Sequence, residues 1–219
     1  MSRASVRPGT LRAKRGYTAV ELLMAISVFG IGVAGIISME KVTSASNQHA
    51  KNLAIATHIA ESWLDMLEAD ATVWNHPSPG FPTDDLNETV WLQNVKLNAG
   101  GGTGNDWFLP AYNPTLGFGP GFDALGNPVN TTTNLAAAQF CVHLRLSWLF
   151  KPPANLDTGN GLIRAEVRVF WLRNGQYAPV AGVNPCDPAT PVTSVSAATA
   201  TSRFHFVQKI TAIRENMKP

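Results

Sequence analysis

The feature that most constrains this chain is a block of eighteen residues without a charged side chain, from Leu22 to Met39. A helix of this length reaches the lower limit needed to cross a bilayer. Residues 1–16, before the block, carry five basic side chains and no acidic one. Positive charge on one side of an apolar helix keeps that side in the cytoplasm. The sequence therefore predicts one membrane helix, with a cytoplasmic leader and an exported C-terminal part.

A secretory signal peptide also begins with basic residues and an apolar stretch, so it is the first alternative for this N-terminus. The block is longer than the apolar region of a typical signal peptide, and no small-residue cleavage site follows it directly. Instead Glu40 and Lys41 follow, and the pattern continues as that of a helix. We therefore expect the block to be retained in the mature protein.

One acidic residue, Glu21, stands directly against the apolar block. A carboxylate at the edge of a membrane helix is unfavourable unless it is paired or neutralised. We expect a cation supplied from elsewhere to pair with it.

The segment GYTAVE at residues 16–21 resembles the class III signal of type IV prepilins. In that family a basic leader ends in Gly, an aromatic residue follows, and Glu is the fifth mature residue. The resemblance implies that a prepilin peptidase cleaves between Gly16 and Tyr17 and methylates the new amine of Tyr17, where the family usually has Phe. Glu21 of one subunit would then pair with the amine of its neighbour, as an assembly residue. An ordinary signal anchor with an incidental Glu at its border is the simpler alternative.

The helical pattern continues beyond the apolar block, because residues 40–71 contain neither Pro nor Gly. Apolar residues recur there at spacings of three and four, which marks one buried helix face. This stripe consists of Leu53, Ala56, Ala60, Trp63 and Leu67. We expect one helix over residues 17–75, in the membrane or a filament core over 17–40 and amphipathic over 41–75. Helix-breaking residues at 75–80 predict its end.

Three later segments alternate apolar and polar residues, as the half-buried strands of an antiparallel sheet do. Their expected apolar faces are Phe140, Val142, Leu144, Leu146, Trp148 and Phe150; Ile163, Ala165, Val167, Val169 and Trp171; and Phe204, Phe206, Ile210 and Ala212. A weaker strand is expected at residues 90–97, a long irregular connection at 99–134 and a hairpin connection at 151–161. Residues 76–219 are expected to form a globular β domain. The predicted fold is α+β and pilin-like, with a long N-terminal helix packed on an antiparallel sheet.

The chain contains two cysteines, Cys141 and Cys186. They lack the C-x-x-C spacing of metal or redox sites, and two cysteines cannot form a structural zinc site by themselves. In an exported domain a disulfide between them is the default interpretation. Two free buried thiols are the alternative.

Residues 28–35 and 52–67 resemble the PilV type of minor pilin, and Val169-Phe170-Trp171 is similar to a late strand of that group. The resemblance implies a single-pass protein of the bacterial inner membrane with a periplasmic C-terminus, later built into a pilus at the cell surface to prime or modify assembly. It also implies four partners: the prepilin peptidase, major and other minor pilins, the inner membrane and the pilus assembly machinery. A minor pseudopilin of type II secretion begins in much the same way but is usually shorter. A membrane-anchored periplasmic binding or enzyme domain is the third alternative.

No enzyme, cofactor or metal site is predicted from the motifs in the chain. His58 and Glu61 lie one helical turn apart, but the second His of a metalloprotease helix is missing. The Gly-rich residues 100–104 lack the Lys of a phosphate loop. The net charge of +2 gives no indication of direct nucleic-acid binding. Trp107 with Phe108 is expected to be exposed, and these two residues are a candidate for binding a partner or a sugar.

Overall fold

The computed structural model describes residues 16–74, 85–95, 107–151, 161–173, 186–187 and 203–215. Several predicted segments lie outside these residues. They are most of the leader (1–15), the breakers at 75–80, the Gly-rich loop at 100–104 and the connection at 152–160. Contacts divide the chain into two compact units, residues 1–49 and residues 50–219.

The long helix, α1, spans Ala19–Ala71, inside the range expected from the sequence. Thr18 caps its first turn, because the Thr18 Oγ1 accepts the N–H of Glu21 at 3.2 Å. At the other end the N–H groups of residues 72–74 bond to carbonyls three positions back. Such bonds tighten the last turn and end the helix.

Five strands form one sheet in the order β2-β1-β3-β4-β5, with every neighbouring pair antiparallel. The long strands are β3 (Phe140–Phe150), β4 (Leu162–Leu172) and β5 (Phe204–Arg214), which coincide with the three alternating segments. The short strands are β1 (Gly121–Phe122) and β2 (Pro128–Val129). Together with α1 they confirm the predicted α+β class.

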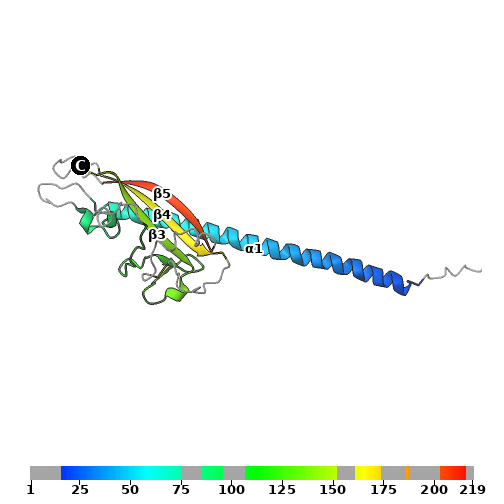
Figure 1. The fold of residues 1–219 in the computed structure, drawn as a ribbon. Helices are drawn as coiled ribbons and strands as arrows, with labels where there is room; N and C mark the ends of the chain where they lie inside the picture. The colour runs from blue at the N-terminus through cyan, green and yellow to red at the C-terminus, as the bar shows by residue number, and fades with distance from the viewer. Residues whose placement is uncertain are drawn as a thin grey trace, which may run out of the picture. The chain divides into compact units, whose positions relative to one another are not determined.

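The core of the globular unit lies between α1 and one face of the sheet (Figure 1). From α1 the buried apolar residues begin at Ala56 and recur through Ala60, Trp63 and Leu67. Leu53 was expected in this stripe but is 43% exposed, since burial of the helix starts one turn later. From the sheet come Val142, Leu144, Leu146, Ile163, Ala165, Val167 and Val169, as the alternation predicted.

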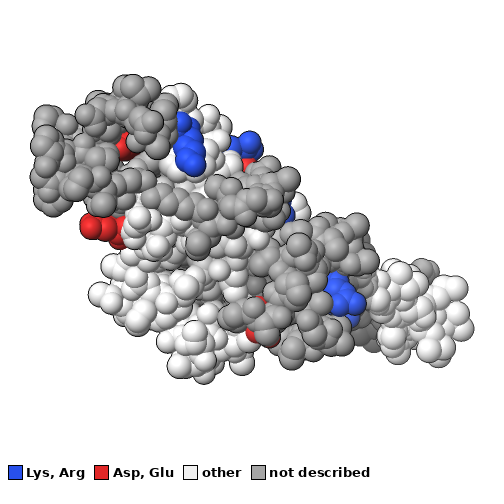
Figure 2. Space-filling view, turned by 60° about the vertical axis from the view of Figure 1, so that its left-hand side comes forward, with Lys and Arg blue, Asp and Glu red and all other residues white. Residues whose placement is uncertain are grey.

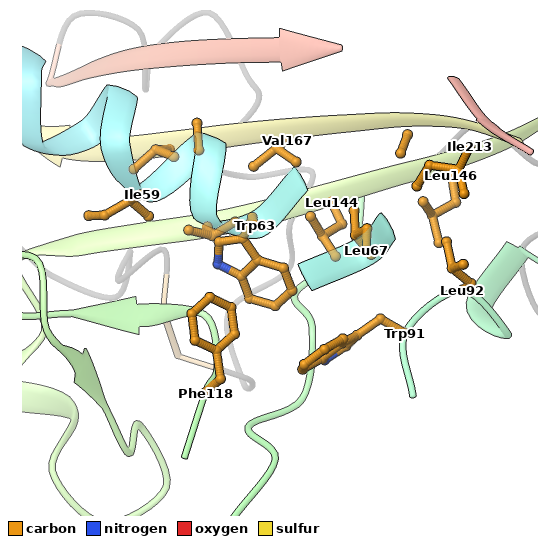
Figure 3. Packing of buried hydrophobic residues seen from close by; sticks show 14 of the residues in the cluster. Ile59, Trp63, Leu67, Trp91, Leu92, Phe118, Leu144, Leu146, Val167 and Ile213 are labelled. Carbon is orange, nitrogen blue, oxygen red and sulfur yellow. The ribbon is translucent and has the colours of Figure 1, made fainter. Parts of the chain in front are cut away.

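Trp63 lies at the centre of this core and is fully buried. Figure 3 shows its indole between Phe118 and Trp91, beneath α1. The ring centroids of Trp63 and Phe118 are 4.9 Å apart, and those of Trp63 and Trp91 are 5.2 Å apart. Tilted and edge-to-face rings at these distances attract one another beyond their buried area.

The prediction of a strand at residues 90–97 is wrong for residues 90–95, the part that the structure describes. The carboxylate of Asp70 accepts the backbone N–H groups of Val90, Trp91 and Leu92 at 2.7–3.0 Å. Amide groups held by a side chain are not available to a strand ladder. The segment therefore turns beneath α1, after the 3-10 helix η1 (Asp85–Glu88).

The region 99–134 is not irregular throughout, because it contains β1 and β2. Gly126 joins these strands in a turn at a φ of +86°, a conformation that favours glycine. Asp123 Oδ1 accepts the N–H groups of Leu125 and Asn127 within the same turn. β1 then pairs with the start of β3.

Two predictions about which face is buried are also wrong. Phe150 is 48% exposed, because a register shift after Trp148 pairs it with Leu162, which lies on the sheet face away from α1. The apolar face expected for β5 likewise points away from the core: Phe206 and Ile210 are 47% and 53% exposed. Cross-strand pairing places His205, Val207, Lys209, Thr211 and Ile213 on the side of α1 instead.

Candidate functional site

The apolar part of α1 has no protein cover, although its side chains are large. Within unit 1 Leu23, Phe29 and Ile31 are 65%, 72% and 76% exposed, and every residue from 16 to 49 is exposed. A helix that is hydrophobic all round belongs in lipid or inside a larger assembly. This surface is therefore the strongest candidate for a functional site.

By length and composition α1 is the one helix in the described residues that is able to cross a membrane. Its best eighteen-residue window has a mean hydropathy of 2.3. An N-terminal helix of this kind is a candidate membrane span or a candidate signal sequence.

Two hydroxyl groups, one in the apolar block and one just after it, are satisfied within the helix. The Ser27 hydroxyl donates to the carbonyl of Leu23 at 2.8 Å, and the Thr43 hydroxyl donates to the carbonyl of Met39 at 2.9 Å. A hydroxyl bonded to its own helix needs no water, so it can lie in an apolar environment.

The three residues of the predicted processing and assembly site lie together at the start of α1. Gly16 and Tyr17 precede the helix, and Tyr17 is 87% exposed. Glu21 is the third helical residue after the Thr18 cap, so T-A-V-E has the spacing of a capping box. Its carboxylate has no partner among the residues that the structure describes. The T-x-x-E pattern of residues 18–21 is the signal in the sequence for this helix start.

Cys141 and Cys186 are joined by a disulfide, with their Cα atoms 5.4 Å apart. Both are fully buried, together with Ala138. The bond attaches residue 186 to the face of β3 that points away from α1.

On this second face of the sheet, Glu166 forms a charged cluster that the sequence did not reveal. It is 1% exposed and contacts Arg145 of β3 and Arg164 of its own strand. Gln208 of β5 donates to Glu166 Oε2 at 2.8 Å and accepts from Arg168. Burial lowers the pKa of Arg168, and the nearby charge of Arg145 lowers it further, while Glu166 opposes both effects.

Trp107 was expected to be exposed, but it is partly buried over this cluster. The Arg168 and Arg145 guanidinium carbons lie 4.0 and 4.9 Å from the centroid of its ring. Cation–π contacts of this kind hold the indole against the sheet. Phe108 is also partly buried, because its backbone forms a bridge with Leu144. These contacts hold Trp107 against the sheet and Phe108 beside β3. On the face drawn in Figure 2 the described charged side chains form small separate patches.

Glu61 of α1 pairs with a lysine of the sheet and not with His58. The Lys209 Nζ donates to Glu61 Oε1 at 2.8 Å. This hydrogen bond and the lysine charge lower the pKa of Glu61 from its ordinary value of 4.5. No group of three metal-ligating side chains occurs within the described ranges.

The Glu61–Lys209 pair gives a pH-dependent prediction. A carboxyl whose pKa is lowered by folding stabilises the fold at pH values above its ordinary pKa. This contribution is lost as the pH falls through the lowered pKa. A carboxyl-carbon NMR titration should place the Glu61 pKa below 4.5 in the wild type and nearer 4.5 in Lys209→Gln. Equal values in the two proteins would contradict the pairing.

No protein-family model matches the chain, and no curated protein or solved structure is significantly similar to it. Its function is therefore inferred from its own residues and their geometry.

Proposed function

We propose that the chain is a minor pilin of a type IV pilus, most similar to the PilV type. The observation that carries the proposal is the uncovered apolar stretch of α1, which follows Gly16 and Tyr17 and has Glu21 in its first turn, at the fifth position after Gly16. In this account the helix is first a single span of the bacterial inner membrane, with the C-terminal unit in the periplasm. It then enters the filament core with major and other minor pilins, through the pilus assembly machinery.

The start of α1 is suited to processing between Gly16 and Tyr17. Both residues lie outside the helix, so their backbone is available to a prepilin peptidase. Cleavage there creates an amine that is predominantly cationic at neutral pH. Methylation of the new amine keeps its positive charge.

The freed amine gives Glu21 the partner that it lacks within the described chain. When apolar helices bundle, the amine of one subunit can meet the carboxylate of the next in a low-dielectric environment, where opposite charges attract strongly. A Glu21 left unpaired there is penalised by its lost hydration. The pair therefore favours subunits that are staggered correctly.

Replacement of Glu21 by glutamine tests the proposal. The variant keeps the size of the side chain and the Thr18 cap but removes the charge, so membrane insertion should be unchanged. Incorporation into sheared pili, measured by immunoblot against the membrane pool, should fall at least several-fold. Glu21→Ala should behave in the same way.

Glu40→Gln is the matched control, because Glu40 is exposed at the far end of the apolar block. It should enter pili normally. Normal incorporation of Glu21→Gln would contradict the pairing argument.

The same N-terminal features also fit a minor pseudopilin of a type II secretion system. Deletion of the gene distinguishes the two functions, because loss of pili supports the pilin proposal. Loss of secreted exoproteins with intact pili would favour the pseudopilin.

A further inference from the structure

A groove of about 560 Å³ opens in the globular unit between residues 90–94 and residues 108–115. Its volume lies within the range of about 300–1,000 Å³ that is usual for small-molecule sites. Neither residues 16–49 nor the disulfide-bonded cysteines line it. Its lining residues, all in the described part of the chain, are uncharged.

Three amide side chains of the groove are each held at one end by the backbone. The Gln93 amide nitrogen donates to the carbonyls of Thr89 and Val90, and the Asn94 amide nitrogen donates to the carbonyl of Trp91. The oxygens of these two amides therefore remain as acceptors.

Asn113 is held in the opposite sense. Its Oδ1 accepts the N–H groups of Thr115 and Leu116 at 2.9 and 3.1 Å, which leaves its amide nitrogen as a donor. The groove thus offers two fixed acceptors and one fixed donor. Polar groups that are already held in place lose little freedom when a ligand binds.

Aromatic walls complete the groove. Tyr112 packs so closely on Gly119 that a Cβ there would lie 3.0 Å from the Tyr112 Cα. Phe108 is fixed by two backbone hydrogen bonds to Leu144, of 2.8 and 2.9 Å. The Trp91 Nε1 donates to the carbonyl of Ala111, which connects the two lining segments.

We propose that this groove binds a neutral saccharide. Each sugar hydroxyl both donates and accepts, which matches a mixed set of amide donors and acceptors. The C–H faces of a sugar ring are apolar and suit an aromatic wall. A phosphate or carboxylate ligand would find no cation among the lining residues to compensate its lost hydration.

The test uses the full chain in lipid nanodiscs, because many common detergents are themselves glycosides. Maltose, lactose and N,N′-diacetylchitobiose are the probes, and saturation-transfer NMR measures binding. Glucose 6-phosphate and glucuronate are the charged comparisons. At least one neutral disaccharide should bind, and the charged compounds should bind at least tenfold more weakly.

Asn113→Asp is the diagnostic variant. An aspartate keeps the acceptor for the Thr115 and Leu116 amides but loses the donor, so the fold should be unchanged and binding should weaken at least tenfold. Asn130→Asp is the matched control, since Asn130 forms a similar turn with Thr132 away from the groove. It should bind as the wild type does.

The proposal is overturned if none of the three disaccharides binds. It is also overturned if Asn113→Asp binds as tightly as the wild type, or if the charged compounds bind equally well. These outcomes leave the pilin proposal untouched, because processing and assembly depend on residues 16–39.

Discussion

Replacing Trp63 by alanine is expected to destabilise the globular unit by about 3–5 kcal/mol, the range for large aromatic side chains removed from a core. Trp63 is fully buried, and its indole connects α1 to Trp91 and Phe118. Those partners come from separate loops, so the movement of one segment cannot fill the cavity that the substitution leaves. For a unit of this size the loss corresponds to a fall of roughly 6–20 °C in Tm.

Thermal unfolding of the full chain in nanodiscs, followed by circular dichroism of the sheet, measures this loss. Leu53→Ala is the matched control on the same helix. Leu53 is 43% exposed, so its truncation should change stability by less than about 1 kcal/mol. Equal effects of the two substitutions would show that Trp63 does not anchor the helix to the sheet.

The second large effect is expected for Glu166→Gln, at about 3 kcal/mol, near the lower end of the range for a broken buried ion pair. The substitution keeps the size of the side chain but leaves Arg145, Arg164 and Arg168 without their common counter-charge. Arg164 is 40% exposed and regains water, which moderates the loss.

Urea unfolding measures the effect, and adding Arg145→Met to Glu166→Gln provides a second measurement. Because the double variant removes one of the uncompensated cations, it should be more stable than Glu166→Gln. Glu68→Gln, on the exposed face of α1, should change stability by about 0.5 kcal/mol or less. A double variant less stable than Glu166→Gln would contradict the interpretation of Glu166 as the counter-charge.

The fold class and the long elements follow from local patterns in the sequence. In α1 the spacing of three and four between apolar residues predicted the buried residues Ala56, Ala60, Trp63 and Leu67. In β3 and β4 the alternation of apolar and polar residues predicted most of the sheet core. These patterns succeed because one side of each element is buried along most of its length. β5 differs, because it is an edge strand in the described sheet and has large apolar residues on its exposed face. Which side chains of such a strand face the core is determined by its pairing with β4 and not by their hydrophobicity.

The remaining errors come from contacts between residues distant in the sequence. Asp70 holds the amides of residues 90–92, twenty or more positions away, and so replaces an expected strand with a turn. A one-residue register shift in β3 moved Phe150 to the other face. Glu166 is buried because residues of three strands surround it. None of these contacts has a local signature in the sequence.

The candidate processing site rests on six consecutive residues, 16–21, and stays a prediction from the sequence. The structure adds that Thr18 caps the helix and that Tyr17 lies outside it. The polar groove near Asn113 could not be predicted, since its two walls are separated in the sequence by residues 95–107.

The most direct test of the central claim is mass spectrometry of the N-terminus after co-expression with a prepilin peptidase. The account predicts a chain that begins at Tyr17, with a methylated amine. A chain that keeps residues 1–16, in a host that processes known pilins, would contradict it. A cut after Met39 would do the same.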